Sequence, residues 1–224
     1  MADAIGQVLA FAVVVSLSPI PIIAVVLMLG TPRARVNGPA FLLGWVLGLS
    51  IVGAIVLVVV GSVGATEGEE PATWVSVLKI VLGVLLVLVA ARQWRGRGRG
   101  GDEEKMPSWM RSIDHFTAGR SIAVAAVLAG VNPKNLLLTV GAAAAIAGTG
   151  VDTAEQVIAL AVFVFVATLG PGAVVAIYFV LGERAKRMLD DLKLWMAAHN
   201  AAIMAAICLV IGAKLIGDGV SGLG

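Results

Sequence analysis

Long apolar stretches, separated by short polar segments, follow one another along the whole chain. Six of them are long enough to cross a hydrocarbon core of about 30 Å, which takes about 20 helical residues. They cover roughly residues 5–30, 38–61, 74–92, 119–148, 155–182 and 196–217. The pattern predicts an all-α integral membrane protein, with six transmembrane helices in a single membrane domain, residues 1–224. The first stretch is too long for a signal-peptide apolar region, so we expect it to remain as a span.

Two of the apolar stretches are interrupted near their middle by the same kind of helix-starting signal. Ser18-Pro19 interrupts the first stretch, and Asn132-Pro133, 114 positions later, interrupts the fourth. A Ser or Asn side chain caps free amides, and proline at the first helical position gives up a hydrogen bond that was not available anyway. We therefore predict broken first and fourth helices. Freed backbone inside a bilayer has to be buried in protein or line a cavity, so paired breaks indicate a transport site.

Composition and charge favour a membrane protein and predict its orientation. Hydrophobic residues make up 59% of the chain and charged residues 13%, against about 25% charged residues in soluble domains, and the mean hydropathy is +1.00. Of the 16 Lys and Arg residues, 13 lie in three alternate connections, whereas connections 61–73 and 148–154 contain none. Because cytoplasmic loops carry the excess of Lys and Arg, we expect a bacterial plasma membrane protein with both termini outside.

A basic connection divides the chain into two halves of three spans each. We predict a first three-helix repeat at residues 1–92, a cytosolic linker with an interfacial helix at 93–118, and a second repeat at 119–224. Because three is odd, the second half has to be inserted upside down, which is the arrangement of inverted repeats in transporters. Gly170-Pro171 predicts a further helix break, in the fifth span.

Lys134 is an ionisable residue placed about midway along a span, directly after Pro133. Lys79 and Lys214 instead lie near the span ends assigned to the outer face, where their side chains can extend to the interface. All 14 Asp and Glu residues lie in loops or at span ends, so the span centres contain no carboxylate. Half-helices beginning at Pro133 and Pro19 would add the positive ends of their dipoles beside Lys134, which favours phosphate, sulfate or carboxylate.

Polar residues continue along the same helix. Asn132, Asn135 and Thr139 recur at i, i+3 and i+7, which places them on one helix face. The alternative is that these groups only hydrogen-bond between helices, and that Lys134 pairs with a helix-end carbonyl. The candidate substrate-binding residues are Ser18, Pro19, Pro21, Asn132, Pro133, Lys134, Asn135 and Thr139.

Other kinds of site find little support in the sequence. His115 and His199 lack partners at metal-ligand spacing and Cys208 is the only cysteine, so we expect no metal, no thiol-redox pair and no cofactor. The spans offer no carboxylate pair and no nucleophile with a base, which argues against an enzyme. The Arg-Gly run at 95–101 is typical of a flexible linker rather than of a nucleic-acid-binding patch.

Several motifs, spread over nearly the whole chain, resemble those of one family. They are Ser18-Pro19-Ile20-Pro21, Pro107-Ser108-Trp109-Met110 followed by Asp114, Asn132-Pro133-Lys134-Asn135-Leu136, Trp195 with Asn200, and Gly212-Ala213-Lys214-Leu215. In these motifs the chain resembles the GAP family, also called the sulfolipid-addressing or Sap family, of the lysine exporter superfamily. The resemblance implies a six-span inner-membrane protein that is associated with moving glycolipids or peptidoglycolipids to actinobacterial cell surfaces.

The resemblance and the candidate anion site together predict a transporter or flippase-like export factor for an anionic lipid or lipid precursor. Its expected partner is membrane lipid, and a lipid-export complex and a homo-oligomer are both left open. One alternative is an exporter of small solutes of the amino-acid type, although the ammonium of an amino acid would lack a buried carboxylate partner. Another is a scaffold that does not transport and that docks a lipid-export complex through its cytosolic loop.

Overall fold

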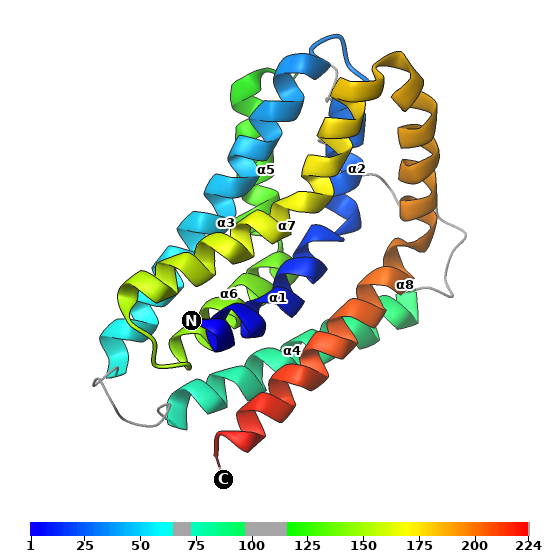
Figure 1. Cartoon of the computed structure of the whole chain (residues 1–224). Coiled ribbons are helices and arrows are strands. Elements are labelled where there is room, and N and C mark those ends of the chain that lie inside the picture. Colours follow the sequence, from blue (N-terminus) through cyan, green and yellow to red (C-terminus); the bar gives the residue numbers. More distant parts are fainter. Residues whose placement is uncertain (65–72, 97–115, 224) are drawn as a thin grey trace.

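The computed structural model describes residues 1–64, 73–96 and 116–223, which form eight helices and no strand (Figure 1). The helices are α1 (Ala2–Ser16), α2 (Pro19–Leu29), α3 (Ala34–Gly64), α4 (Thr73–Gly96), α5 (Ala118–Gly130), α6 (Pro133–Ala147), α7 (Thr153–Leu181) and α8 (Glu183–Ser221). The predicted interfacial helix lies almost entirely outside these residues, because 97–115 are not among them.

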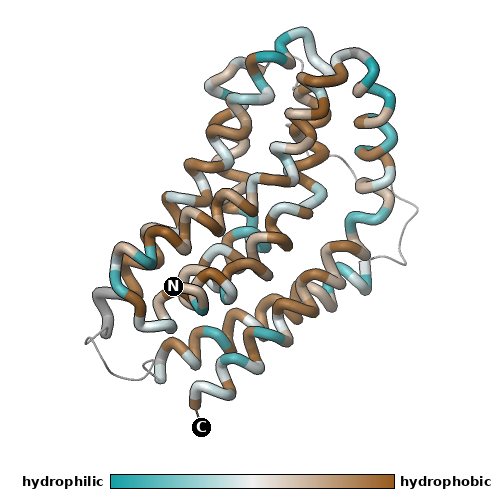
Figure 2. Tube along the Cα trace, viewed as in Figure 1, coloured by the Kyte–Doolittle hydropathy of each residue, from teal (hydrophilic) through white to brown (hydrophobic). Residues whose placement is uncertain are grey.

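Between four and six membrane spans fit these helices by length and composition. The helices α3, α4, α7 and α8 are each long and apolar enough to cross a membrane, and hydrophobic residues run along most of their length (Figure 2). The pairs α1–α2 and α5–α6 pass the same test together, and each adds one span if it is counted as a single broken helix. The all-helical membrane class predicted from the sequence is therefore confirmed.

Both predicted breaks in the first and fourth apolar stretches are confirmed. Helices α1 and α2 meet at 49°, with α2 beginning at Pro19, and α5 and α6 meet at 64°, with α6 beginning at Pro133. Proline fixes a backbone angle suited to the first helical turn and cannot continue the hydrogen-bond ladder of a preceding helix. Each proline therefore starts a new half-helix.

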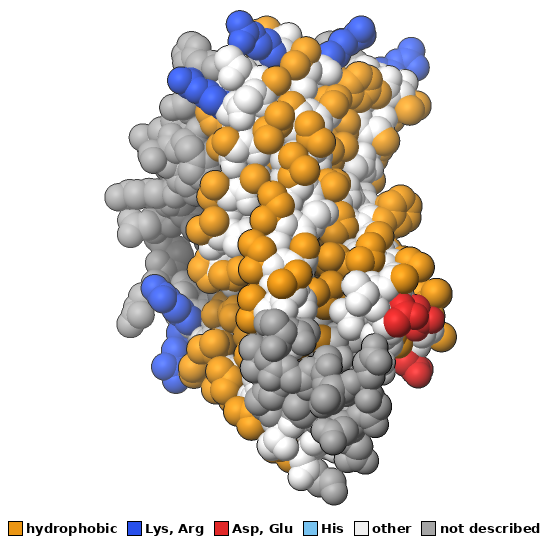
Figure 3. Space-filling view, turned by 90° about the vertical axis from the view of Figure 1, so that its left-hand side faces the viewer, with side chains coloured by type: hydrophobic (Ala, Val, Ile, Leu, Met, Phe, Trp, Pro, Cys, Tyr) orange, Lys and Arg blue, Asp and Glu red, His pale blue; other side chains and the backbone are white. Residues whose placement is uncertain are grey.

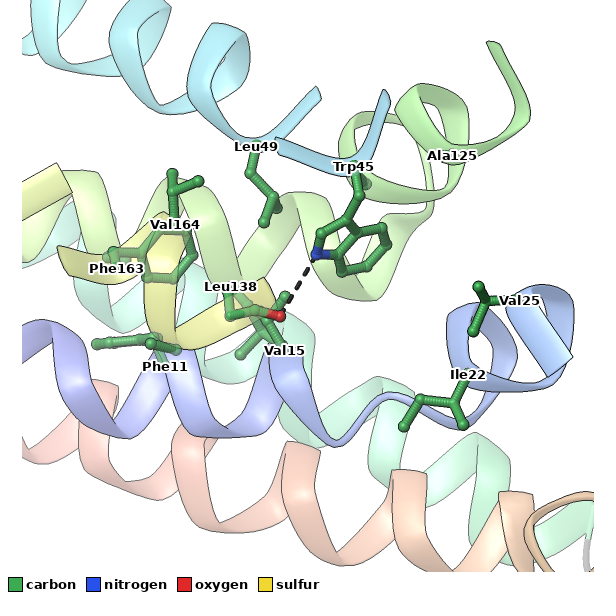
Figure 4. Close-up of a cluster of buried hydrophobic side chains, with 14 of the residues drawn as sticks. Phe11, Val15, Ile22, Val25, Trp45, Leu49, Ala125, Leu138, Phe163 and Val164 are labelled. Atoms are coloured by element: carbon green, nitrogen blue, oxygen red, sulfur yellow. Dashed lines mark hydrogen bonds between the residues drawn. The ribbon is translucent and has the colours of Figure 1, made fainter. Parts of the chain in front are cut away.

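The break predicted at Gly170-Pro171 is wrong, because α7 continues through both residues. Pro171 has no N–H to donate to the carbonyl of Ala167, four residues earlier. The indole Nε1 of Trp45 in α3 donates to that oxygen instead, at 3.3 Å (Figure 4). The neighbouring Gly170 amide donates to Ser16 Oγ in α1 at 2.7 Å. The Trp45 indole thus replaces the donor that Pro171 lacks, and α7 stays continuous.

Helix α8 is longer than the last predicted span. It begins at Glu183 and so includes the basic segment 184–193 that the sequence placed in a connection. Ala185 and Leu189 of this segment are buried, as is Met196 just beyond it, at spacings of four and seven residues that suit one helix stripe. This buried stripe explains why the segment is helical.

Glycines let two helix pairs approach each other closely. A Cβ atom added at Gly44 of α3 would lie 2.2 Å from the carbonyl oxygen of Ile122 in α5. Between α4 and α8, Gly83 and Gly212 face each other, and a Cβ at either would lie 2.7 to 2.8 Å from the other's carbonyl oxygen. Such close backbone approach by small residues is typical of helix packing in membranes.

The centre of the protein is filled by large side chains from several helices. Phe11, Trp45, Leu138 and Phe163 come from α1, α3, α6 and α7 and are all fully buried (Figure 4). The outer surface is also largely apolar: in Figure 3, most of the visible Lys and Arg side chains lie at the upper end, others lie lower down on the left, and the visible acidic side chains lie near the lower end. An apolar surface between polar ends suits a protein surrounded by lipid.

Candidate functional site

Lys134 and Ser18 meet where the two broken helices come together. The Lys134 Nζ atom donates a hydrogen bond to Ser18 Oγ at 2.6 Å, across 116 positions of the sequence. Both residues are 3% exposed. The break between α1 and α2 and the break between α5 and α6 therefore form one polar junction inside an apolar bundle.

Ser18 occupies the cap position of α2, but its hydroxyl does not cap the helix. Instead it accepts from Lys134 and has two acceptors within reach, Asn135 Oδ1 at 3.1 Å and the Val14 carbonyl at 3.4 Å. A hydroxyl has a single hydrogen to donate, so the shorter contact, with Asn135, takes it in this arrangement. Ser18 thereby connects the ammonium of Lys134 to the amide of Asn135.

Asn135 joins the two halves of the α5–α6 pair. Its Nδ2 donates to the Leu128 carbonyl at 2.9 Å, an oxygen in the last turn of α5 that has no partner within its own helix. Asn135 is itself 1% exposed, and its amide supplies the partner that this part-buried carbonyl lacks in α5. The interhelical hydrogen-bonding role that the sequence left open for Asn135 is thus present in the structure.

The first turn of α2 offers few free amides. Pro19 and Pro21 have no N–H, and the Ile22 amide bonds to the Ser18 carbonyl at 3.4 Å. Only the Ile20 amide is left in this turn without a hydrogen bond to the residues described. Because Pro21 also lacks an N–H, the first turn of α2 has one described backbone amide that is free to donate to a ligand.

The first turn of α6 likewise has few backbone amides without an acceptor among the described residues. The Asn132 side chain caps the helix by accepting from the Lys134 amide at 3.2 Å, as predicted, and the Asn132 carbonyl accepts from the Leu136 amide at 2.8 Å. Pro133 has no N–H, which leaves the Asn135 amide without an acceptor in the part of the chain that the structure covers. Each half-helix therefore begins with one described amide that has no acceptor and with the positive end of the helix dipole, and both would favour an anion.

The charge of Lys134 has no acidic partner in the described residues. No ion pair involves Lys134 there, and its one hydrogen-bond acceptor is the neutral Ser18 hydroxyl. An uncompensated ammonium in a low-dielectric interior costs several kcal/mol. The junction is therefore electrostatically suited to an anion. Because Lys134 is 3% exposed, an anion can reach it only if surrounding helices separate.

A sequence model of one protein family matches residues 8–221, nearly the whole chain, and the family is described as Sap, sulfolipid-1-addressing protein. The chain belongs to the Sap family. The match includes both helix breaks and Lys134, so the family resemblance seen in the motifs is confirmed. No match was found among curated proteins or among solved structures. As a member of the Sap family with several apolar helices, the protein is a membrane protein.

Two further buried residues of this Sap protein belong to helices that pack near the junction. Thr139, one turn beyond Asn135 in α6, is fully buried, and its hydroxyl has no hydrogen-bond partner among the described residues. Cys208 of α8 is buried and lies near Lys134. Sequence reasoning missed Cys208, because only the packing of α8 against the half-helices brings it there.

The proline-bearing turn of α7 supports the junction of the Sap protein from the other side. A Cβ atom at Gly170 would lie 1.9 Å from the Ser16 carbonyl oxygen, two residues before Ser18. Gly170 and Pro171 therefore do not break a helix but let α7 lie directly against the end of α1. In the covered part of the chain, no group of three or more His, Cys, Asp or Glu residues is placed to hold a metal ion.

Proposed function

We propose that this Sap-family protein is an export factor, transporter or flippase-like, for an anionic glycolipid or lipid precursor of the cell envelope. The observation that carries this proposal is the buried ammonium of Lys134, whose only hydrogen-bond acceptor in the described residues is a neutral hydroxyl. A buried charge of this kind is stabilised by a counter-ion. A phosphate, sulfate or sugar-acid headgroup would provide one.

The surrounding backbone supports an anion rather than a cation at this place. The Ile20 and Asn135 amides lack acceptors among the described residues, and each belongs to the N-terminal turn of a half-helix, where the dipole is positive. Together with Lys134, they make three donors from two helices. The family description names a sulfolipid, and a sulfate ester is an anion of the class that such donors recognise.

We further propose that the chain crosses a bacterial plasma membrane six times, as two inverted three-helix repeats at 1–92 and 119–224. In this arrangement α1–α2 and α5–α6 are each one broken span, and both termini lie outside. The equivalent positions of Ser18 and Asn132 at the two breaks support the repeat. The distribution of Lys and Arg residues supports the orientation.

Lipid movement in vesicles tests the proposal. The purified protein is reconstituted with a fluorescent phosphatidylglycerol, which is anionic, or with a phosphatidylcholine carrying the same dye, which is zwitterionic. Dithionite then bleaches the dye that reaches the outer leaflet. We expect the protein to accelerate the movement of the anionic lipid, and Lys134→Gln to abolish this acceleration.

The matched control is Lys193→Gln, which removes a lysine charge from an exposed pair with Asp190 outside the junction. This variant should behave like the unmodified protein. If Lys134→Gln moves the anionic lipid as fast as the unmodified protein, the proposed role of Lys134 is wrong. If the unmodified protein moves neither lipid, the scaffold alternative is favoured.

A further inference from the structure

A second group of charged side chains lies at the far end of α6 from Lys134. It consists of the charged residues Lys79 of α4 and Lys214 and Asp218 of α8, together with the neutral Gln7 of α1, and we call it the outer cluster. Lys214 pairs with Asp218 and donates to Gln7 Oε1 at 3.2 Å. The sequence predicted that Lys79 and Lys214 can extend to the interface, and in the structure Lys214 also contacts groups on α1 and α8.

Lys79 brings a second ammonium to the outer cluster. A Cβ atom added at Gly148, the cap at the C-terminal end of α6, would lie 3.3 Å from the Lys79 Nζ atom. Helices α4 and α8 pack closely here, because a Cβ atom at Gly219, next to Asp218, would lie 2.6 Å from Cγ1 of Ile80, next to Lys79. Lys79 makes no hydrogen bond or ion pair with the residues described. Two ammonium groups thus share one carboxylate, which leaves an excess positive charge.

Helix α6 connects this cluster to the Lys134 junction. Lys134 lies in its first turn and Gly148 caps its last turn, a separation of about 21 Å at 1.5 Å per residue. The buried Thr139 hydroxyl, which has no partner among the described residues, lies between the two ends. Farther along, Gly141 packs against Phe11, and the Lys214 ammonium lies 5.8 Å from the centre of the Phe11 ring. Positive groups therefore stand at both ends of one half-helix.

We propose that Lys79 and Lys214 form a second anion site, which receives the anionic headgroup after it leaves Lys134. Asp218 is the resident carboxylate that the headgroup displaces from Lys214. Each ammonium has three donors and no acceptor, so the pair can hold two oxygens of a sulfate or phosphate group. The cluster is accessible, since the Lys214 and Asp218 side chains are about one-third exposed. This inference rests on the proposed function in taking an anionic lipid as the cargo.

A structural role and an anion-binding role of the two lysines can be told apart through Asp218. The Lys214–Asp218 pair, at i and i+4 on α8, is a common stabilising arrangement and needs no third charge. Lys79 comes from another helix and adds a like charge, part of which is offset by the negative end of the α6 dipole at Gly148. A bound anion would offset the rest. The two roles also predict opposite effects for Asp218. A structural carboxylate would be needed for stability, whereas a competing carboxylate would oppose anion binding.

Counting bound lipids by native mass spectrometry tests the second site. The probe is 3-sulfogalactosylceramide, added to the purified full-length protein. We expect two bound copies for the unmodified protein and one for the Lys79→Gln, Lys214→Gln double variant. Asp218→Asn should keep two copies and bind the second copy more tightly. The change expected at this site is roughly tenfold in either direction, as for the loss or gain of one charge-assisted contact. Lys193→Gln is the control and should match the unmodified protein.

The outcomes separate this inference from the proposed function. Two copies at unchanged affinity in the double lysine variant, or weaker binding in Asp218→Asn, would overturn the second site. Lys134→Gln that still binds two copies would refute the Lys134 junction alone. Competition by inorganic sulfate for the second copy assigns the site to the sulfate group itself. Resistance to sulfate, with loss of that copy in the lysine variant, assigns it to the headgroup of an intact lipid.

Discussion

The Lys134 ammonium and the Ser18 hydroxyl lie 2.6 Å apart, although 116 positions separate them in the sequence. Ser18 precedes the first residue of α2, and Lys134 is the second residue of α6. The contact therefore joins the starts of two half-helices. It also places the one buried lysine of the described residues where two helix dipoles present their positive ends. Three positive features in one place are unfavourable for stability and favourable for binding an anion.

Stability and binding should therefore respond in opposite directions at Lys134. Lys134→Met keeps the length of the side chain but removes a buried charge that has no acidic partner among the described residues. We expect the free energy of unfolding to rise by about 1 kcal/mol or more, while binding of an anionic lipid is lost. Thermal unfolding of the purified protein in detergent measures the first effect. A lower unfolding temperature than that of the unmodified protein would show that the charge is already compensated.

Gly170 and Gly172 offer a matched pair on one helix. A Cβ atom at Gly170 would lie 1.9 Å from the Ser16 carbonyl oxygen, whereas at Gly172 the nearest contact is a Thr168 methyl group at 4.0 Å. We expect Gly170→Ala to separate α7 from α1 and to cost about 3 kcal/mol or more, and Gly172→Ala to be tolerated. Membrane abundance and unfolding temperature measure both. Equal behaviour of the two variants would contradict the close contact at Ser16.

Trp45 and Pro171 should be coupled in their effects on stability. Trp45→Phe removes the donor to the Ala167 carbonyl and leaves a buried oxygen unsatisfied, at a cost of about 1 to 3 kcal/mol. In a Pro171→Ala background, the new backbone N–H can take that carbonyl, so Trp45→Phe should cost about 1 kcal/mol less. A double-mutant cycle of unfolding free energies measures this coupling. Additive effects would mean that the indole bond does not compensate for the proline.

The helix breaks could be predicted from the sequence because their causes are local. Pro19 and Pro133 each follow a capping residue, and no other part of the chain is needed to start a helix there. The pattern at Gly170-Pro171 looks equally local, but its outcome depends on Trp45, which is 122 positions from Ala167 in the sequence. Sequence reasoning had no means of placing that donor.

The candidate site was predictable in part for the same reason. The position of Lys134 near the middle of a span follows from hydropathy, whereas its contact with Ser18 depends on how two broken helices pack. The loss of amide donors at Pro19 and Pro21 is visible in the sequence, since proline has no N–H. The grouping of Lys79 with Lys214 and Asp218 is not visible, because α4 and α8 are distant in the sequence and meet only through packing.

The proposed orientation can be tested at two exposed positions of the described chain. Gly119 lies at the start of α5, where an added Cβ meets nothing within 4 Å, and Ser221 is exposed at the end of α8. Single cysteines are placed at each in a Cys208→Ala background and labelled in intact cells with an impermeant thiol reagent. We expect labelling at Ser221→Cys and protection at Gly119→Cys. The reverse pattern would invert the proposed topology.

Recognition of an anionic group by Lys134 is measured most directly by comparing two lipids that differ only in a sulfate. The equilibrium binding of 3-sulfogalactosylceramide and of galactosylceramide is measured on the purified protein, on Lys134→Gln and on Lys134→Arg. We predict that the unmodified protein prefers the sulfated lipid by about tenfold or more, that Lys134→Gln loses most of this preference, and that Lys134→Arg keeps part of it. An undiminished preference in Lys134→Gln would contradict the account.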